Sequence, residues 1–324
     1  MPKIMTKLLF LFFLLLSPYL LFADGHIFVY HRFDDNRYPT TNISTKELRK
    51  EFNYLKKHNY KVVPLIDIVN KIDKGESVPS NWVAFTIDDG FKSFYTHGLS
   101  VFREYHFPFT LFIAVKYTEE KYKDYVSWKQ LKTIAKYGDV EFHSYGHGHY
   151  GQMTNKEIKA DIKKGLALMK KHLNYEPNLF VYPYGEYDTR VEKVLDEYNF
   201  KAVFNQNIGA VNGICTDIKD IDRSAVVGSN AHDFKLYLKF QELCGVHFQQ
   251  PKTYPKDKIV KTVEVTLDDK SIKSADIFIS NNGWRKVKVN NGKILWHANK
   301  HIKLNRIKIG VKVKSKIKLM VLSK

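Results

Sequence analysis

The sequence predicts an α/β fold: a distorted or incomplete (β/α) barrel of parallel strands, followed by a small C-terminal antiparallel β domain. Short apolar runs alternate with helical patterns over most of the chain, as in βα units. From about residue 261 the pattern changes to strict apolar–polar alternation, which is typical of antiparallel strands. The length of 324 residues allows two domains. We therefore divide the chain into an export signal (1–23), a barrel (24–250) and a basic β domain (251–324).

The N-terminus has the layout of a secretory signal peptide. Lys3 and Lys7 precede an apolar run at residues 8–22, and Ala23 offers a cleavage site. Leu21 is larger than the usual residue two positions before that site, and an uncleaved segment would anchor the chain in the membrane. In both cases we expect an exported protein, periplasmic or secreted.

The chain has two cysteines, Cys215 and Cys244. Export permits a disulfide between them. The sequence does not show whether they approach closely enough, so two buried free thiols agree with it equally well.

The predicted barrel strands are short apolar runs at His26–Tyr30, Lys61–Leu65, Trp82–Ile87, Phe109–Val115, Val140–Phe142, Leu179–Tyr182 and Lys201–Phe204. Helical patterns lie between them. The residues suited to cap the N-termini of these helices are Ser44, Ser127, Thr154 and Asp188.

The predicted strands of the β domain are residues 262–267, 275–280, 284–289, 293–296 and 302–313, with hairpin signals at Asn282-Gly283 and Asn291-Gly292. Its basic residues include Lys308, Lys312, Lys314, Lys316 and Lys318, which we expect on a solvent-facing side. They would either bind an anionic envelope surface or keep edge strands soluble.

Composition excludes several classes of protein. Hydrophobic residues make up 44% and charged residues 27%, which excludes a disordered chain and a polytopic membrane protein. The net charge is +18, of which residues 251–324 carry +14, from 19 Lys and Arg against 5 Asp and Glu. Because we expect export, we expect no nucleic-acid partner.

Polar residues directly follow several predicted strands. Asp88, Asp89 and Gly90 come after one strand, and His143 comes after another and precedes His147 by four positions. The C-terminal ends of barrel strands form the active-site face, so these residues should meet there. Two imidazoles and one carboxylate suit Zn²⁺ and its neighbours, while the second carboxylate stays free as a base. Taken singly, each motif also agrees with an ordinary polar loop.

Two further signals follow strands. Tyr182-Pro183-Tyr184-Gly185 is a constrained loop whose backbone N–H groups can point into a site, although it also agrees with a plain turn. His31, between Tyr30 and Arg32, ends the first strand, where a lone histidine is more often structural.

In this order the motifs resemble those of the polysaccharide deacetylase family of metal-dependent carbohydrate esterases. The early Tyr30-His31-Arg32 is similar to the permuted subgroup, which includes exported deacetylases of poly-β-1,6-N-acetylglucosamine. The resemblance covers residues 26–230.

The resemblance implies a role for each matched residue. Asp89, His143 and His147 would hold a divalent metal, with Zn²⁺ expected and Co²⁺, Ni²⁺ or Fe²⁺ as alternatives. Asp88 would act as the general base, His31 as the general acid and the backbone N–H of Tyr184 as the oxyanion donor. Independently of the resemblance, Tyr145, Tyr150, Tyr184 and Tyr187 have rings that can stack on sugars or pack in the fold, and we expect Tyr145, Pro183 and Tyr187 to bind substrate.

One position departs from the family pattern. Members commonly carry an arginine two residues before the proline of the third motif, and Val181 stands there in this chain. Either Arg223 supplies that charge or it is an ordinary surface arginine. His247 is a rival of His31 for the acid role.

Together these observations predict an exported hydrolase that removes N-acetyl groups from an N-acetylglucosamine-containing polysaccharide by metal-assisted attack of water. The alternatives are a peptidoglycan deacetylase and a catalytically inactive carbohydrate-binding or envelope-anchoring protein.

Overall fold

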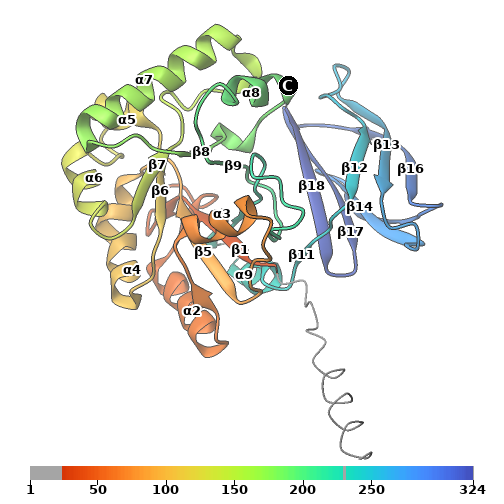
Figure 1. Cartoon of the computed structure of the whole chain (residues 1–324), viewed down its shortest axis with the longest axis horizontal. Helices are drawn as coiled ribbons and strands as arrows, with labels where there is room; N and C mark the ends of the chain where they lie inside the picture. The colour runs from red at the N-terminus through yellow and green to blue at the C-terminus, as the bar shows by residue number, and fades with distance from the viewer. Residues whose placement is uncertain (1–23, 229–230, 324) are drawn as a thin grey trace, which may run out of the picture.

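The computed structural model describes residues 24–228 and 231–323. The expected signal segment, residues 1–23, lies outside the described residues. An α/β part coloured red to green lies beside a blue β part formed by the end of the chain (Figure 1). Among the described residues, no helix has both the length and the apolar character to cross a membrane.

One eight-stranded parallel sheet carries the α/β part. Its order is β10-β1-β5-β6-β7-β8-β9, with β4 also paired to β5. The strands are β1 (His26–Tyr30), β4 (Lys61–Val62), β5 (Trp82–Ile87), β6 (Thr110–Ile113), β7 (Asp139–Phe142), β8 (Leu179–Val181), β9 (Ala202–Phe204) and β10 (Ser224–Ala225). This open, curved sheet confirms the predicted incomplete barrel.

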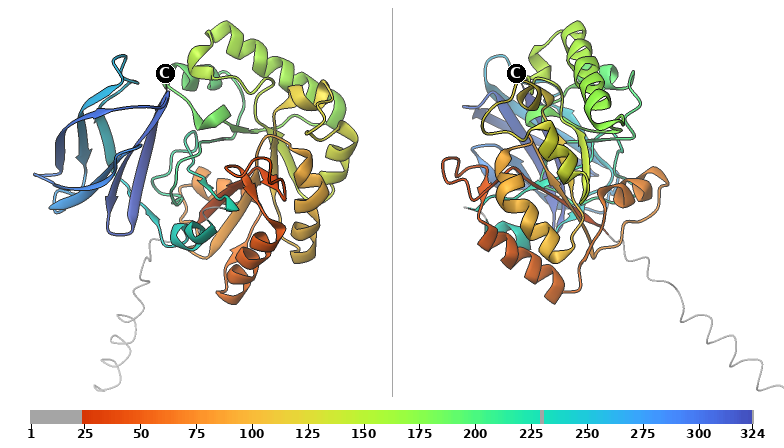
Figure 2. Two further views of the ribbon diagram at one scale, coloured as in Figure 1. Left: turned by 180° about the vertical axis from the view of Figure 1, so that it is seen from behind. Right: turned by 90° about the vertical axis from the view of Figure 1, so that its left-hand side faces the viewer.

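Helices cover the outside of the sheet (Figure 2). They are α2 (Thr45–Lys57), α4 (Leu99–Tyr105), α5 (Val115–Glu119), α6 (Trp128–Ile134), α7 (Asn155–Leu173), α8 (Thr189–Leu195) and α9 (Ala231–Tyr237). A further helix, α3 (Leu65–Asp73), packs with the apolar cluster on the other face of the sheet. Shorter elements are β2 (Arg32–Phe33), β3 (Asn42–Ile43), a π-helical turn (Phe94–Gly98) and two 3₁₀ turns (Tyr150–Gln152 and Pro183–Gly185).

The predicted helix caps are confirmed. Ser44, Ser127, Thr154 and Asp188 each accept a hydrogen bond from a backbone N–H three residues later. The predicted strand at 61–65 was too long. It ends at Val62, and Leu65 begins α3 directly after Pro64, whose fixed φ suits the start of a helix.

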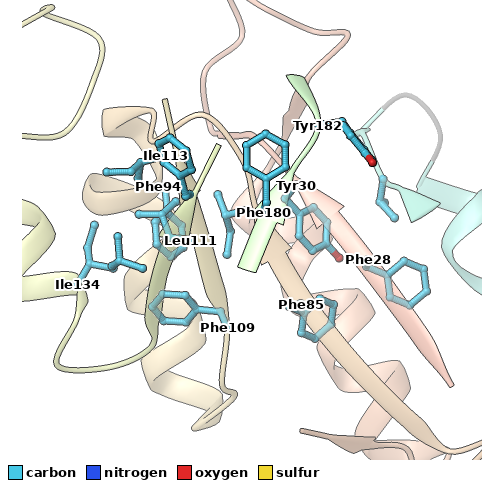
Figure 3. Packing of buried hydrophobic residues seen from close by; sticks show 14 of the residues in the cluster. Phe28, Tyr30, Phe85, Phe94, Phe109, Leu111, Ile113, Ile134, Phe180 and Tyr182 are labelled. Carbon is cyan, nitrogen blue, oxygen red and sulfur yellow. The ribbon is translucent and has the colours of Figure 1, made fainter. Parts of the chain in front are cut away.

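Both faces of the parallel sheet are buried, as expected for βα units. In β1, Phe28 and Tyr30 enter one apolar cluster while Ile27 enters another; in β5, Phe85 and Ala84 divide in the same way. Figure 3 shows part of the first cluster, where Phe28 and Tyr30 of β1 lie beside Phe85 of β5. This two-sided packing keeps the strand ends rigid beneath the candidate site.

The β part contains two antiparallel sheets around an apolar core. One has the order β11-β18-β17-β14-β15 and the other β12-β13-β16. The strands are β11 (Gln241–Glu242), β12 (Val246–Gln250), β13 (Ile259–Leu267), β14 (Ser274–Ile279), β15 (Gly283–Lys288), β16 (Lys293–His301), β17 (Arg306–Val313) and β18 (Lys316–Ser323). The predicted strand at 302–313 begins only at Arg306, and β18, which pairs with it, was not predicted. Strands β11 and β12 precede residue 251 yet pair with β18 and β13.

Two lysines expected on the solvent side face the α/β part instead. Lys318 lies 3.5 Å from Asp222 and 3.1 Å from Glu242. Lys308 donates a hydrogen bond to the carbonyl of Gln206, and its burial lowers its pKa to about 8. The apolar–polar alternation of a strand does not show that the α/β part provides hydrogen-bond acceptors and carboxylates for the lysines on this face.

Cys215 and Cys244 form a disulfide, with their Cα atoms 5.7 Å apart. This decides between the two alternatives that the sequence left open. The bond joins the loop after β9 to the segment between β11 and β12, so it ties the α/β part to the β part.

Stability should depend on pH through Glu51 of α2. Its carboxylate accepts a 2.5 Å hydrogen bond from Tyr30, and burial raises its pKa from 4.5 to about 8. The folded state keeps this proton to a higher pH than the unfolded chain does, so the free energy of unfolding should fall as pH rises between these values, by about 1.4 kcal/mol per pH unit. Glu51→Gln keeps an acceptor for Tyr30 and should flatten this slope in urea unfolding. If the free energy of unfolding has the same pH dependence in Glu51→Gln as in the unmodified chain, the assignment is wrong. Glu47→Gln on the same helix is the control.

Candidate metal centre

The parallel sheet brings the predicted polar residues to one edge. Asp88 and Asp89 follow β5, His143 follows β7 and His31 follows β1. The Tyr184 loop follows β8. Because all these strands run in the same direction, their C-terminal ends share one edge of the sheet.

Asp89, His143 and His147 converge as predicted. One ligand atom from each lies within 4.8 Å of the other two. The Oδ1 atom of Asp89 is 3.4 Å from Nε2 of His143 and 3.1 Å from Nε2 of His147. The two Nε2 atoms are 3.0 Å apart. Carboxylate and imidazole donors at this spacing suit a first-row divalent cation.

The polar groups around the triad fit a cation. Nδ1 of His143 lies 2.9 Å from the carbonyl of Val181, so its N–H donates there and leaves Nε2 as an acceptor facing the triad. Oδ1 of Asp89 is buried without a hydrogen-bond donor. Burial would raise the pKa of Asp89, but the two imidazoles outweigh it and hold the pKa well below its usual range. An ionised carboxylate therefore meets two imidazoles at one point. Burial would lower the pKa of His143, but the neighbouring aspartates outweigh it and raise that pKa.

The backbone around the triad is unusual. Asp89, Ser144 and His147 have φ values of 72°, 67° and 52°, a region that residues other than glycine rarely adopt. Gly90 has φ 80°, and a Cβ there would lie 3.2 Å from Ile113. Strained backbone of this kind is concentrated at functional sites.

Asp161 of α7 fixes the loop between the two histidines, and sequence reasoning missed it. Its carboxylate accepts hydrogen bonds from the N–H groups of Tyr145 and Gly146, at 2.7 and 2.8 Å. It also accepts one from the Tyr150 hydroxyl at 2.9 Å. Gly165, one turn later on α7, allows close approach, because a Cβ there would lie 2.4 Å from Phe142. An aspartate in a helix that otherwise looks solvent-exposed gives no sign of this role.

Asp88 is held by Arg223, which settles the question raised by Val181. The guanidinium is fully buried and donates two 2.8 Å hydrogen bonds to the two oxygens of Asp88. Arg223 also donates to Thr86 and to the carbonyl of Asn205. Burial would raise the pKa of Asp88, but the charge and hydrogen bonds of Arg223 outweigh it and lower the pKa. Arg223 is therefore the orienting cation and not a surface residue.

His31 lies close enough to both aspartates to feel their charges. Burial lowers its pKa below 6.5, Asp89 and Asp88 act in the opposite direction, and Arg223 adds to the lowering. Its Nε2 lies 3.5 Å from the side-chain nitrogen of Gln206. Its rival, His247, lies on β12, where its imidazole contacts Asp268 at 3.0 Å. The structure thus brings His31 to the candidate site and places His247 in the β part.

Tyr184 stands at the rim with φ 60°. Its ring is 39% exposed, stacks on His149 at 4.1 Å and meets His147 edge-on at 4.4 Å. Arg306 of β17 donates a hydrogen bond to the carbonyl of Tyr184. The β part therefore contacts the loop that carries the predicted oxyanion donor.

The other residues predicted to bind substrate differ in exposure. The hydroxyl of Tyr145 donates to Glu120 at 3.2 Å near the surface. Pro183 is buried within the Tyr184 loop. The ring of Tyr187 stacks on buried Tyr182 at 4.6 Å.

Residues 75–203 match the family model for polysaccharide deacetylases. By this match, residues 75–203 belong to the polysaccharide deacetylase family. Curated proteins similar to this chain include poly-β-1,6-N-acetyl-D-glucosamine N-deacetylases. That of Escherichia coli K12 is 22% identical over 53% of this chain and 32% of its own length. That of Staphylococcus aureus MRSA252 is 24% identical over 49% of this chain and 59% of its own length. The chain thus spans about a third to three-fifths of the length of these relatives.

Solved structures show the same fold. The deacetylase PplD of Streptococcus pyogenes, in complex with acetate, has a TM-score of 0.60 at 16% identity and covers 66% of this chain and 97% of its own. IcaB of Ammonifex degensii has a TM-score of 0.59 at 22% identity and covers 67% of this chain and 97% of its own. Both matches extend over about two thirds of this chain.

The Arg223–Asp88 pair should be essential for stability. Arg223→Met leaves a buried carboxylate without its partner, and we expect a loss of about 3–5 kcal/mol in the free energy of unfolding, measured with urea. Adding Asp88→Asn removes the stranded charge and should recover part of that loss. A double variant no more stable than the single one would show that the loss has another source.

Proposed function

We propose that this chain is an exported, metal-dependent N-deacetylase of an N-acetylglucosamine-containing polysaccharide. The observation that carries the proposal is that the two neighbouring aspartates have different partners. Asp89 joins the two histidines, while both oxygens of Asp88 are hydrogen-bonded to Arg223. An acetamide hydrolase needs this combination of a cation site and a free carboxylate. The names of the curated relatives support the choice of polymer.

We propose that Asp89, His143 and His147 hold Zn²⁺, with Co²⁺, Ni²⁺ or Fe²⁺ as alternatives. When bound, such an ion polarises the acetyl carbonyl and makes water acidic enough to attack it near neutral pH. Asp88 is ionised because Arg223 lowers its pKa, and it accepts the proton of the attacking water. Arg223 also fixes the direction of the carboxylate through its two hydrogen bonds.

The remaining proton steps belong to His31 and Tyr184. We assign the general acid to His31. Burial lowers its pKa, so it is neutral at rest, and it receives the proton that Asp88 takes from the attacking water. Its imidazolium then donates that proton to the nitrogen of the leaving sugar, since an amide anion is too basic to depart. We assign the oxyanion donor to the backbone N–H of Tyr184, in a turn that Arg306 contacts through the Tyr184 carbonyl. Tyr145, Pro183 and Tyr187 are the proposed neighbours of the sugar.

We further propose that the chain works outside the cytoplasm. The expected signal at residues 1–23 supports export, and so does the Cys215–Cys244 disulfide, because such bonds persist in oxidising compartments. The β part then offers its basic surface to an anionic envelope component. A cleft of about 700 Å³ beside the larger sheet has five lysines and two aspartates among its lining residues: Lys273, Lys286, Lys312, Lys314, Lys316, Asp269 and Asp276.

Metal binding should depend on the triad and not on the neighbouring histidine. We expect purified His147→Ala, measured by elemental analysis, to lose the divalent metal that the unmodified chain retains. His149→Ala is the matched control, because His149 contacts Glu186 at 2.7 Å and lies outside the triad. Equal metal content in His147→Ala and the unmodified chain would contradict the site.

Acetate release from N-acetylglucosamine oligomers by the metal-loaded chain tests the function itself. Asp88→Asn should lower kcat by about 10²–10⁴, which is the range for loss of a general base, while metal content is unchanged. Full activity of Asp88→Asn would remove the assigned role. If the chain releases acetate from peptidoglycan but not from these oligomers, the substrate is peptidoglycan. If it releases acetate from neither, a carbohydrate-binding protein is favoured over an enzyme.

A further inference from the structure

One face of the larger β sheet carries an ordered set of aromatic and charged side chains. Strand pairing places Trp284 opposite Phe278, and Phe278 opposite Gly310. In the next row, Lys286 is opposite Asp276, and Asp276 is opposite Lys312. Residues opposite each other in register share a face of the sheet, so the aromatic row and the charged row are adjacent.

Trp284 is held as an exposed platform. It is 41% exposed, and its ring lies 5.2 Å from that of Phe278. Gly310 makes room for it, because a Cβ there would lie 3.3 Å from the far end of the indole. The ammonium of Lys312 lies 4.7 Å from the ring centre. Neighbours below and beside the indole thus fix its orientation while one part stays open to solvent.

Polar groups border this platform. Lys312 lies 3.5 Å from Asp276, and both side chains are partly exposed. Both residues, with exposed Lys286, also line the cleft of about 700 Å³. An aromatic ring beside hydrogen-bonding donors and acceptors suits a saccharide, whose ring has an apolar face and hydroxyl edges.

The same face leads to the candidate metal centre. Along β17, Arg306, Lys308, Gly310 and Lys312 alternate onto it. Arg306 donates to the Tyr184 carbonyl and Lys308 to the Gln206 carbonyl, and both acceptors lie in loops of the candidate site. Gly310, under the indole, is about 7 Å along the strand from Lys308. A few linked sugars span the distance from this platform to the catalytic loops.

We propose that the Trp284 platform, meaning Trp284, Phe278, Asp276, Lys286 and Lys312, binds the still-acetylated part of the polysaccharide strand whose other sugars reach the metal centre. This inference rests on the proposed function. Trp284 stacks on a sugar ring, while Asp276 and the lysines bind hydroxyl and acetamido groups. The two lysines exceed the one aspartate in charge, so they repel a product strand whose amines are cationic. The platform therefore retains substrate and favours release of product.

The kinetic test uses the full metal-loaded chain and N-acetylglucosamine dimer and hexamer. Trp284→Ala should raise KM for the hexamer about fivefold to tenfold, as expected for one lost stacking contact, with kcat and the dimer kinetics unchanged. Leu295→Ala is the matched control, because Leu295 is 61% exposed on β16 of the other sheet. An unchanged hexamer KM in Trp284→Ala would overturn the inference and leave the proposed function intact.

A calorimetric test needs no turnover. The Asp88→Asn chain should bind the acetylated hexamer more tightly than the fully deacetylated one, and Trp284→Ala should weaken binding of the acetylated hexamer. Lys286→Glu, at an exposed position, replaces a positive charge by a negative one and should strengthen binding of the cationic, deacetylated hexamer. The difference in affinity between the acetylated and the deacetylated hexamer should therefore become smaller. Equal binding of both hexamers, or binding unaffected by Trp284→Ala and Lys286→Glu, would overturn the inference. If Trp284-dependent binding occurs while no variant releases acetate, the proposed function fails and the saccharide surface stands.

Discussion

The buried ion pair between Arg223 and Asp88 is the interaction on which the candidate site depends. Two adjacent carboxylates at the end of β5 would repel each other and compete for the same cation. Arg223 reduces this conflict by donating a hydrogen bond to each oxygen of Asp88, which gives that carboxylate a cationic partner of its own. Asp89 turns in the opposite direction through its left-handed backbone. One carboxylate therefore joins the two imidazoles, and the other keeps its own partner.

The second constraint is the rigidity of the loop between the two histidines. The imidazoles meet only because His147 adopts a positive φ and because Asp161 holds the backbone N–H groups between them. Asp161 comes from α7, which packs closely on Phe142 of β7 through Gly165. A helix and a strand thus fix the loop from two sides, which maintains the geometry without a bound ion.

The β part is joined to this site by charge as well as by a disulfide. Lys318 pairs with Asp222, the residue before Arg223, and Arg306 holds the carbonyl of Tyr184. These contacts connect the β part to the segment that carries Arg223, the partner of the proposed base, and to the loop that carries the proposed oxyanion donor. The same sheet continues outward to Trp284. The β part is in this sense one wall of the site and not an independent appendage.

Local sequence determined much of this protein. Alternation of apolar runs and capped helices predicted the parallel sheet, and the position of Asp88, Asp89 and His143 after strands predicted their meeting, because parallel strands end at one edge. Tertiary structure decided the rest. Whether Arg223 was buried, whether Lys308 and Lys318 faced solvent, and whether Cys215 met Cys244 depended on partners far away in the chain. Asp161 and Trp284 acquire their surroundings only from packing, which no local pattern encodes.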